Sequence, residues 1–234
     1  MGFSVIVPVE TNDLGWKDLI KDLSFLTCDD ECLFVSPEDF KEDLFELVRR
    51  NKLSCQVEHL LSKKGRAIQQ NVGARASKNS ILWFIHCDSR IPKESFINLK
   101  RCLVADSISL YFFDLKFFEN QKIMRLNEIG VHIRSRKFRL PFGDQAFCMS
   151  KETFKKLGGF DESLPFGEDH LLVWKAHQKK IKIKAAEASI YTSARRYQSY
   201  GWIKTTSLHF WLTLKQAAPQ LYILLKMTIK KEKS

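Results

Sequence analysis

The sequence lacks the cysteine spacings of zinc-binding and disulfide-stapled proteins. Its six cysteines include no Cys-x-x-Cys pair, and no second ligand pair accompanies Cys28 and Cys32. They lie in apolar or helical contexts, which favours reduced thiols in a cytosolic protein. No RNA-binding signature and no Cys/His finger spacing occur either, so nucleic acid is not the expected partner.

The sequence also lacks an uninterrupted apolar run that could span a membrane. The apolar C-terminal stretch is broken by Lys215, Pro219 and Lys226, whereas a spanning helix needs roughly 20 residues with few charges. The first ten residues have no basic segment ahead of their short apolar run and do not resemble a signal peptide. We expect a cytoplasmic protein whose C-terminal segment covers the core or lies peripherally at the inner membrane face.

The chain does have a strong excess of positive charge. Its 234 residues carry a formal net charge of +11, with basic clusters in residues 130–143 and 225–234. A basic surface attracts acidic membranes or phosphorylated small molecules, and a solvated basic face is the alternative interpretation. No internal repeat, linker or low-complexity tract occurs. We therefore expect one domain over residues 1–211, with residues 212–234 as its basic amphipathic helix and tail.

Short apolar runs alternate with helical patterns through the first 90 residues. Strands are predicted at residues 3–9, 31–35, 53–60 and 80–86, and helices at 13–26, 36–51 and 65–78. Ser36 before Pro37 is the predicted cap of the second helix. This alternation predicts a parallel sheet with right-handed crossovers and an α/β fold.

The second half of the sequence is less regular. Helices are predicted at 92–105, 121–138 and 167–181, a strand at 107–118, and a strand and helix within 146–160 that Gly158-Gly159 ends.

Asp88 lies just past the predicted strand 80–86. In parallel sheets, ligands bind at the carboxyl ends of strands. One or two carboxylates with substrate phosphates are typical of magnesium or manganese sites, so Asp88 is a candidate metal ligand. A helix cap is the alternative role.

Other candidate residues lie at predicted helix starts and turns. Arg66 follows Gly65 at a helix start and could clamp a phosphate. Glu168 and Asp169 open a later helix, where the dipole favours acids, but a carboxylate there could also serve as a general base. Arg195 and Arg196 suit phosphate binding or form a solvated pair.

The order of these motifs carries a resemblance. The segments "GRAIQQNVGARA", "HCDSRIP", "GDQ", "LGGFDE", "ED" and "TSARR" follow one another from residue 65 to residue 196. This order resembles the family-2 glycosyltransferases, most closely a compact soluble subgroup with an HxD metal motif and a TSARR segment. The resemblance implies the GT-A (Rossmann-like) fold: a mixed, mainly parallel sheet flanked by helices, here with a C-terminal amphipathic helix.

The resemblance also implies an activity. The chain would carry out metal-dependent, inverting, non-processive transfer of a sugar from a nucleoside-diphosphate sugar to an acceptor hydroxyl, with Mn²⁺ or Mg²⁺. Asp88 would bind the metal, and Asp169 would be the catalytic base with Glu168 beside it. The basic C-terminal end suggests a lipid-linked acceptor. We expect Asp88 and Asp169 to converge on one pocket at the lip of the sheet.

The resemblance further implies a donor-binding set. Its members are Pro8, Val9, Glu10, Asp39, Arg66, Asn71, His86, Gly143, Asp144, Gln145, Arg195 and Arg196. Ser36 stands where the family usually has an aspartate that touches the base, and Asp39 is the candidate for a later acid. Ser36 keeps open a non-catalytic relative that binds sugar nucleotides or membrane surfaces. A nucleotidyltransferase is a further alternative, although no glycine-rich phosphate loop follows the first strand.

Overall fold

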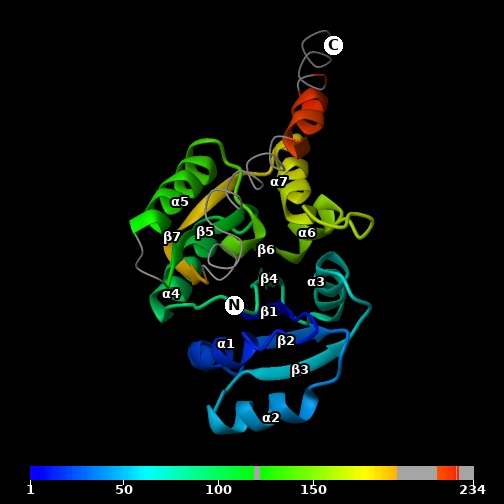
Figure 1. The fold of residues 1–234 in the computed structure, drawn as a ribbon, viewed down its shortest axis with the longest axis vertical. Coiled ribbons are helices and arrows are strands. Elements are labelled where there is room, and N and C mark those ends of the chain that lie inside the picture. The colour runs from blue at the N-terminus through cyan, green and yellow to red at the C-terminus, as the bar shows by residue number, and fades with distance from the viewer. Residues whose placement is uncertain (119–121, 194–214, 225, 227–234) are drawn as a thin grey trace.

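The computed structural model describes residues 1–118, 122–193, 215–224 and 226, and its centre is a seven-stranded sheet (Figure 1). The strands are β1 Phe3–Pro8, β2 Glu31–Ser36, β3 Gln56–Leu61, β4 Ile81–Phe84, β5 Leu110–Phe117, β6 Cys148–Ser150 and β7 Ile183–Thr192. Their order is β3-β2-β1-β4-β6-β5-β7. Only β6 pairs antiparallel with its neighbours, which confirms the predicted mixed, mainly parallel sheet.

Helices cover both faces of this sheet. They are α1 Trp16–Asp22, α2 Lys41–Arg50, α3 Arg66–Ala76, α4 Lys93–Ala105, α5 Lys122–His132, α6 Lys151–Leu157 and α7 Glu168–Gln178. Short helical turns are η1 Leu23–Phe25, the π-helical η2 Ile133–Lys137, and η3 Gly143–Gln145. Because strand side chains alternate, Val5 and Val7 face the core formed with α1, α2 and α4, whereas Ile6 faces α3, α6 and α7.

Helix α3 packs unusually closely on the sheet. A methyl group added to Gly73 would lie 2.5 Å from Ile6 Cγ2, so only glycine fits there. The Gln69 amide donates hydrogen bonds to the carbonyls of Val9 at 2.7 Å and Val35 at 2.8 Å. Gln69 therefore ties α3 to the carboxyl ends of β1 and β2, the edge where ligands are expected.

Two local features differ from the sequence-based expectation. Ser36 is the last residue of β2 and caps no helix, because α2 begins only at Lys41. The Ser36 hydroxyl lies 2.8 Å from His59 Nε2 instead. Strand β7 was not predicted; its central residues, Ala185–Glu187, lack the branched and aromatic side chains typical of strands.

The C-terminal segment is helical over residues 215–224 and at 226, in agreement with part of the predicted amphipathic helix. Gln220 Oε1 accepts a hydrogen bond from Gln178 Nε2, at the end of α7, at 3.0 Å, and the helix extends beyond that end of α7 (Figure 1). The rest of the predicted 212–234 element lies outside the described residues. No helix in the described part of the chain has the length and apolar character needed to cross a membrane.

Candidate active site

Gly143 in η3 joins two of the predicted site segments. Its backbone N–H donates a hydrogen bond to Asp169 Oδ2 at 2.6 Å. A methyl group at Gly143 would lie 3.0 Å from Asp169 Oδ2 and 3.3 Å from His86 Nε2. The turn η3 therefore lies directly between the segment that follows β4 and the start of α7.

Asp144, the next residue, is an acid whose pKa depends on the charged residues around this turn. The residue is half-buried, and its Oδ1 atom is shielded from solvent and receives no hydrogen bond from the described residues. The pKa of Asp144 is raised to about 6, mainly by burial; Asp169 and Asp88 contribute to this rise, while Arg134 and Arg66 oppose it. The cavity that Asp88 lines does not include Asp169, so the convergence of these two acids on one pocket stays a prediction.

Arg66 faces the start of α7 from the start of α3. Gly65, with a φ of 135°, makes the turn before the helix, and Arg66 Nη1 lies 3.8 Å from Glu168 Oε1. Glu168 is buried, which raises its pKa; Asp169 adds to the rise and Arg66 opposes it. Arg66 therefore places positive charge among the acids of the site.

Arg134 in η2 lies beside the GDQ turn and was not among the predicted residues. Its guanidinium carbon lies 3.4 Å from the ring centroid of Phe142, and its Nη1 donates to the Leu140 carbonyl at 2.7 Å. It also opposes the raised pKa of Asp144. The sequence signal for Arg134 is the basic cluster in residues 130–143, which runs into the GDQ turn.

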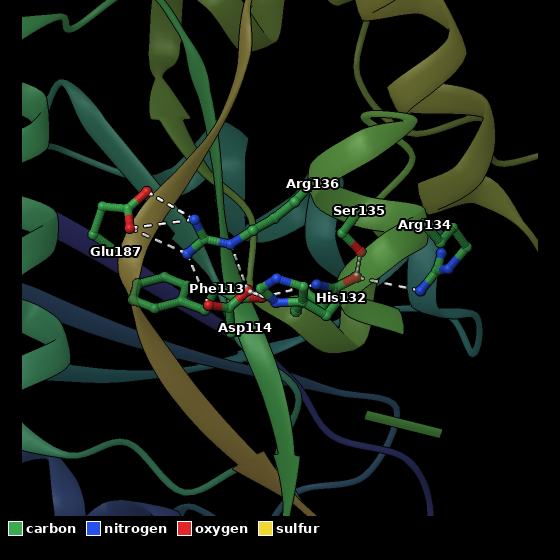
Figure 2. Close-up of polar contacts among 8 residues, drawn as sticks. Phe113, Asp114, His132, Arg134, Ser135, Arg136 and Glu187 are labelled. Carbon is green, nitrogen blue, oxygen red and sulfur yellow. Dashed lines mark hydrogen bonds and ion pairs between the residues drawn. The ribbon is translucent and has the colours of Figure 1, made fainter. Parts of the chain in front are cut away.

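Two predicted donor-binding residues use their amides inside the protein. Gln145 is fully buried; its Nε2 donates to the Phe113 carbonyl at 2.8 Å, and its Oε1 accepts from Ser135 Oγ at 2.7 Å (Figure 2 shows Phe113 and Ser135). The Asn71 amide exchanges hydrogen bonds of 2.9 and 3.1 Å with the backbone of Phe160. Gln145 and Asn71 therefore position the turns around the site.

The remaining predicted residues lie around the same sheet edge or beyond it. Pro8 and Val9 are buried at the end of β1, and Glu10 is exposed. Asp39 is exposed, 3.6 Å from His59 Nδ1. Arg195 and Arg196 lie outside the described residues.

Asp88 opens onto a cavity of about 290 Å³. Its lining residues are Gly15, Asp18, Asp88, Arg90, Phe118 and Ser193. A methyl group at Gly15 would lie 3.0 Å from the Asp88 Cα atom, so the loop after β1 passes close to the backbone of this acid.

The donor set of this site suits a hard divalent cation. The described residues contain no group of three or more His, Cys, Asp or Glu placed to hold a metal alone. However, Mg²⁺ and related ions usually keep several waters and take one or two carboxylates together with substrate phosphates. Asp88, which lines a cavity, fits such a partial set, and the buried Oδ1 of Asp144 has no hydrogen-bond partner among the described residues.

No family model and no curated protein matches the sequence. Among solved structures, the mannosyltransferase PcManGT from Pyrobaculum calidifontis, in complex with GDP-Man and Mn²⁺, matches with a TM-score of 0.65 and 15% identity over 97% of this chain and 68% of that chain. GalNAc-T7 with UDP, GalNAc and Mn²⁺ matches with a TM-score of 0.59 and 13% identity over 82% and 44% of the two chains.

The S. aureus protein TarS is also similar. Its structure matches with a TM-score of 0.63 and 18% identity over 83% of this chain but only 37% of that chain. A TarS 1-349 structure in complex with UDP-GlcNAc matches with a TM-score of 0.61 and 20% identity, over 82% and 58% of the two chains. This chain thus spans well under two thirds of TarS. Together these likenesses show that the chain has the GT-A glycosyltransferase fold.

Proposed function

We propose that the chain transfers a sugar from a nucleoside-diphosphate sugar to an acceptor hydroxyl, as a non-processive, inverting enzyme of the family-2 type. The observation that carries this proposal is the position of η3 at one edge of a GT-A sheet, where Gly143 N donates to Asp169 Oδ2 at 2.6 Å and a methyl group at Gly143 would lie 3.3 Å from His86 Nε2, two residues before Asp88. Arg66 Nη1 lies 3.8 Å from Glu168, the residue before Asp169. Solved structures of this fold hold UDP-GlcNAc or GDP-Man, which supports a nucleotide-sugar donor.

The donor diphosphate would lie between Asp88 and Arg66. Asp88 would hold Mn²⁺ or Mg²⁺, and this ion, when bound, offsets the negative charge of the departing nucleoside diphosphate. Arg66 stands at the N-terminus of α3, where the helix dipole and the guanidinium group both favour a phosphate.

Asp169 would act as the general base. Gly143 N and His170 N each donate one hydrogen bond to a different Asp169 oxygen, at 2.6 and 2.8 Å, which fixes the carboxylate. Each oxygen has two lone pairs, so capacity remains to accept the acceptor's hydroxyl proton. The acceptor oxygen then bonds to the anomeric carbon as the bond to the diphosphate breaks on the opposite face.

A lipid-linked acceptor is the finer part of the proposal. It is supported by the basic residues at positions 225–234, which would attract an anionic membrane surface.

The test is nucleotide release from UDP-Glc, UDP-GlcNAc and GDP-Man with Mn²⁺ present. Asp169→Asn should retain donor affinity but turn over about 10²–10⁴-fold more slowly, the usual worth of general-base assistance. Asp43→Asn, a substitution on the exposed face of α2, should match the wild type. An Asp169→Asn rate equal to wild type would reject the base assignment, and binding without turnover in the wild type would favour the non-catalytic alternative.

A further inference from the structure

Helix α5 and the turn that follows it expose an apolar face. Its members, Ile123, Leu126, Ile129, Ile133 and Phe138, are each between 40% and 60% exposed. We call these five residues the α5–η2 apolar face. Contiguous exposed apolar side chains of this size mark interaction sites more often than ordinary surface.

The opposite side of the same segment packs against the protein core. Met124, Asn127 and Ser135 are buried, and Val131 packs against the core cluster. Spacings of three and four residues place these side chains on one side of the helix. The side chains of the α5–η2 apolar face therefore do not contribute to the core, since the inward side of the segment provides the packing.

Ion pairs hold the end of this segment rigidly on the sheet. Arg136 Nε and Nη2 donate to Asp114 Oδ1 and Oδ2 at 3.0 and 2.8 Å, and its Nη1 donates to Glu187 Oε1 at 3.1 Å (Figure 2). Asp114 belongs to β5 and Glu187 to β7, so one arginine ties η2 to two strands. This bidentate geometry is the strong form of an ion pair, and it keeps the apolar face turned outward.

The charges around the face have one sign. Arg125, Lys137 and Arg139 are exposed on this segment. Its only acid, Glu128, is half-buried and accepts a hydrogen bond from the Phe117 backbone N–H at 2.9 Å. Apolar side chains flanked by bases, without an exposed acid, complement a surface that is apolar below and anionic above.

We propose that the α5–η2 apolar face docks on an anionic lipid bilayer, with its apolar side chains at the acyl boundary and its basic residues among the headgroups. Through Arg134, the same η2 turn contacts Phe142 and Gln145 beside the candidate active site. Docking would therefore hold the mouth of that site near the membrane. The proposal does not depend on sugar transfer.

The test is flotation of the full chain with vesicles of phosphatidylcholine alone or mixed with phosphatidylglycerol. The wild type should float only with the mixed vesicles, and the double variant Leu126→Gln/Ile129→Gln should bind them at least about tenfold more weakly, because two half-exposed aliphatic side chains lose their burial. Val104→Gln/Ile108→Gln, which changes two exposed apolar residues at and after the end of α4, should bind like the wild type.

Three flotation results would overturn the proposal. They are equal flotation with both vesicle types, unchanged flotation of Leu126→Gln/Ile129→Gln, and loss of flotation on removing residues 227–234 alone. A wild-type dimer that dissociates in Leu126→Gln/Ile129→Gln, without vesicle binding, would also overturn it in favour of a second copy as the occupant. Nucleotide binding measured on the same variant keeps this outcome separate from the proposed transfer.

Discussion

At the residue scale, the Asp144 carboxyl group lies in surroundings that are unfavourable for its charged form but suited to a bound cation. Its Oδ1 atom is buried without a hydrogen bond from the described residues, and burial raises its pKa to about 6. A carboxylate in such surroundings destabilises the folded protein at neutral pH, yet it can accept charge from a bound cation. Sites of this kind trade stability for function.

Replacement of Asp144 by Asn should therefore stabilise the protein. The folded-state pKa of about 6 lies above the ordinary value of 3.8, so the stability linked to this proton is present below pH 4 and lost as pH rises through 6. At pH 7 Asp144→Asn should gain on the order of 2–3 kcal/mol in unfolding free energy, and almost nothing at pH 4. Urea unfolding at both pH values measures this. A variant less stable than wild type at pH 7 would contradict the assignment.

Residue types at strand ends and helix starts were enough to find Asp88, Arg66 and Asp169 as candidates. The amides of Gln145 and Asn71 hold neighbouring backbone, an orientation that sequence does not show, and their donor-binding role stays a prediction. Arg134 was not predicted, because its contact with the Phe142 ring depends on a π-helical turn that no local sequence pattern indicates.

At the element scale, the close packing of α3 on the sheet depends on the contact between Gly73 and Ile6. Gly73→Ala would place a methyl group 2.5 Å from Ile6 Cγ2, a fully buried atom of β1. We expect a loss of about 1–3 kcal/mol in unfolding free energy, because either the helix or the strand must shift. Thermal or urea unfolding provides the measurement.

Gly130→Ala is the matched control in α5. No atom lies within 4 Å of the added methyl group, so the change should stabilise the helix by about 0.5–1 kcal/mol. Equal effects of the two substitutions would show that α3 does not pack on β1 as described.

Local sequence indicates some elements of the fold, whereas others depend on contacts with distant parts of the chain. β1, β2 and β4 are mainly apolar and buried along their whole length, which local sequence indicates well. β7 contains small and charged residues and a left-handed Glu187 with φ of 51°, so it is a strand mainly because β5 pairs with it. Ser36 was misassigned because a hydroxyl before proline looks alike at a cap and at a strand end.

At the scale of the whole molecule, the strand order explains the site. β2 and β4 flank β1 on opposite sides, and the chain segments that leave β1 and β4 meet at the carboxyl edge of the sheet. The alternation of strands and helices predicted this edge. The contact between Arg66 and Glu168 depends on how α3 and α7 are brought together across the sheet, which sequence pattern does not specify.

Calorimetric titration with UDP and GDP, with and without Mn²⁺, tests the central claim most directly. The account predicts that one of the two nucleotides binds only with Mn²⁺, that Asp88→Asn abolishes this binding, and that Asp169→Asn and Asp43→Asn retain it. Binding that is indifferent to Mn²⁺, or undiminished in Asp88→Asn, would contradict a diphosphate site built on Asp88.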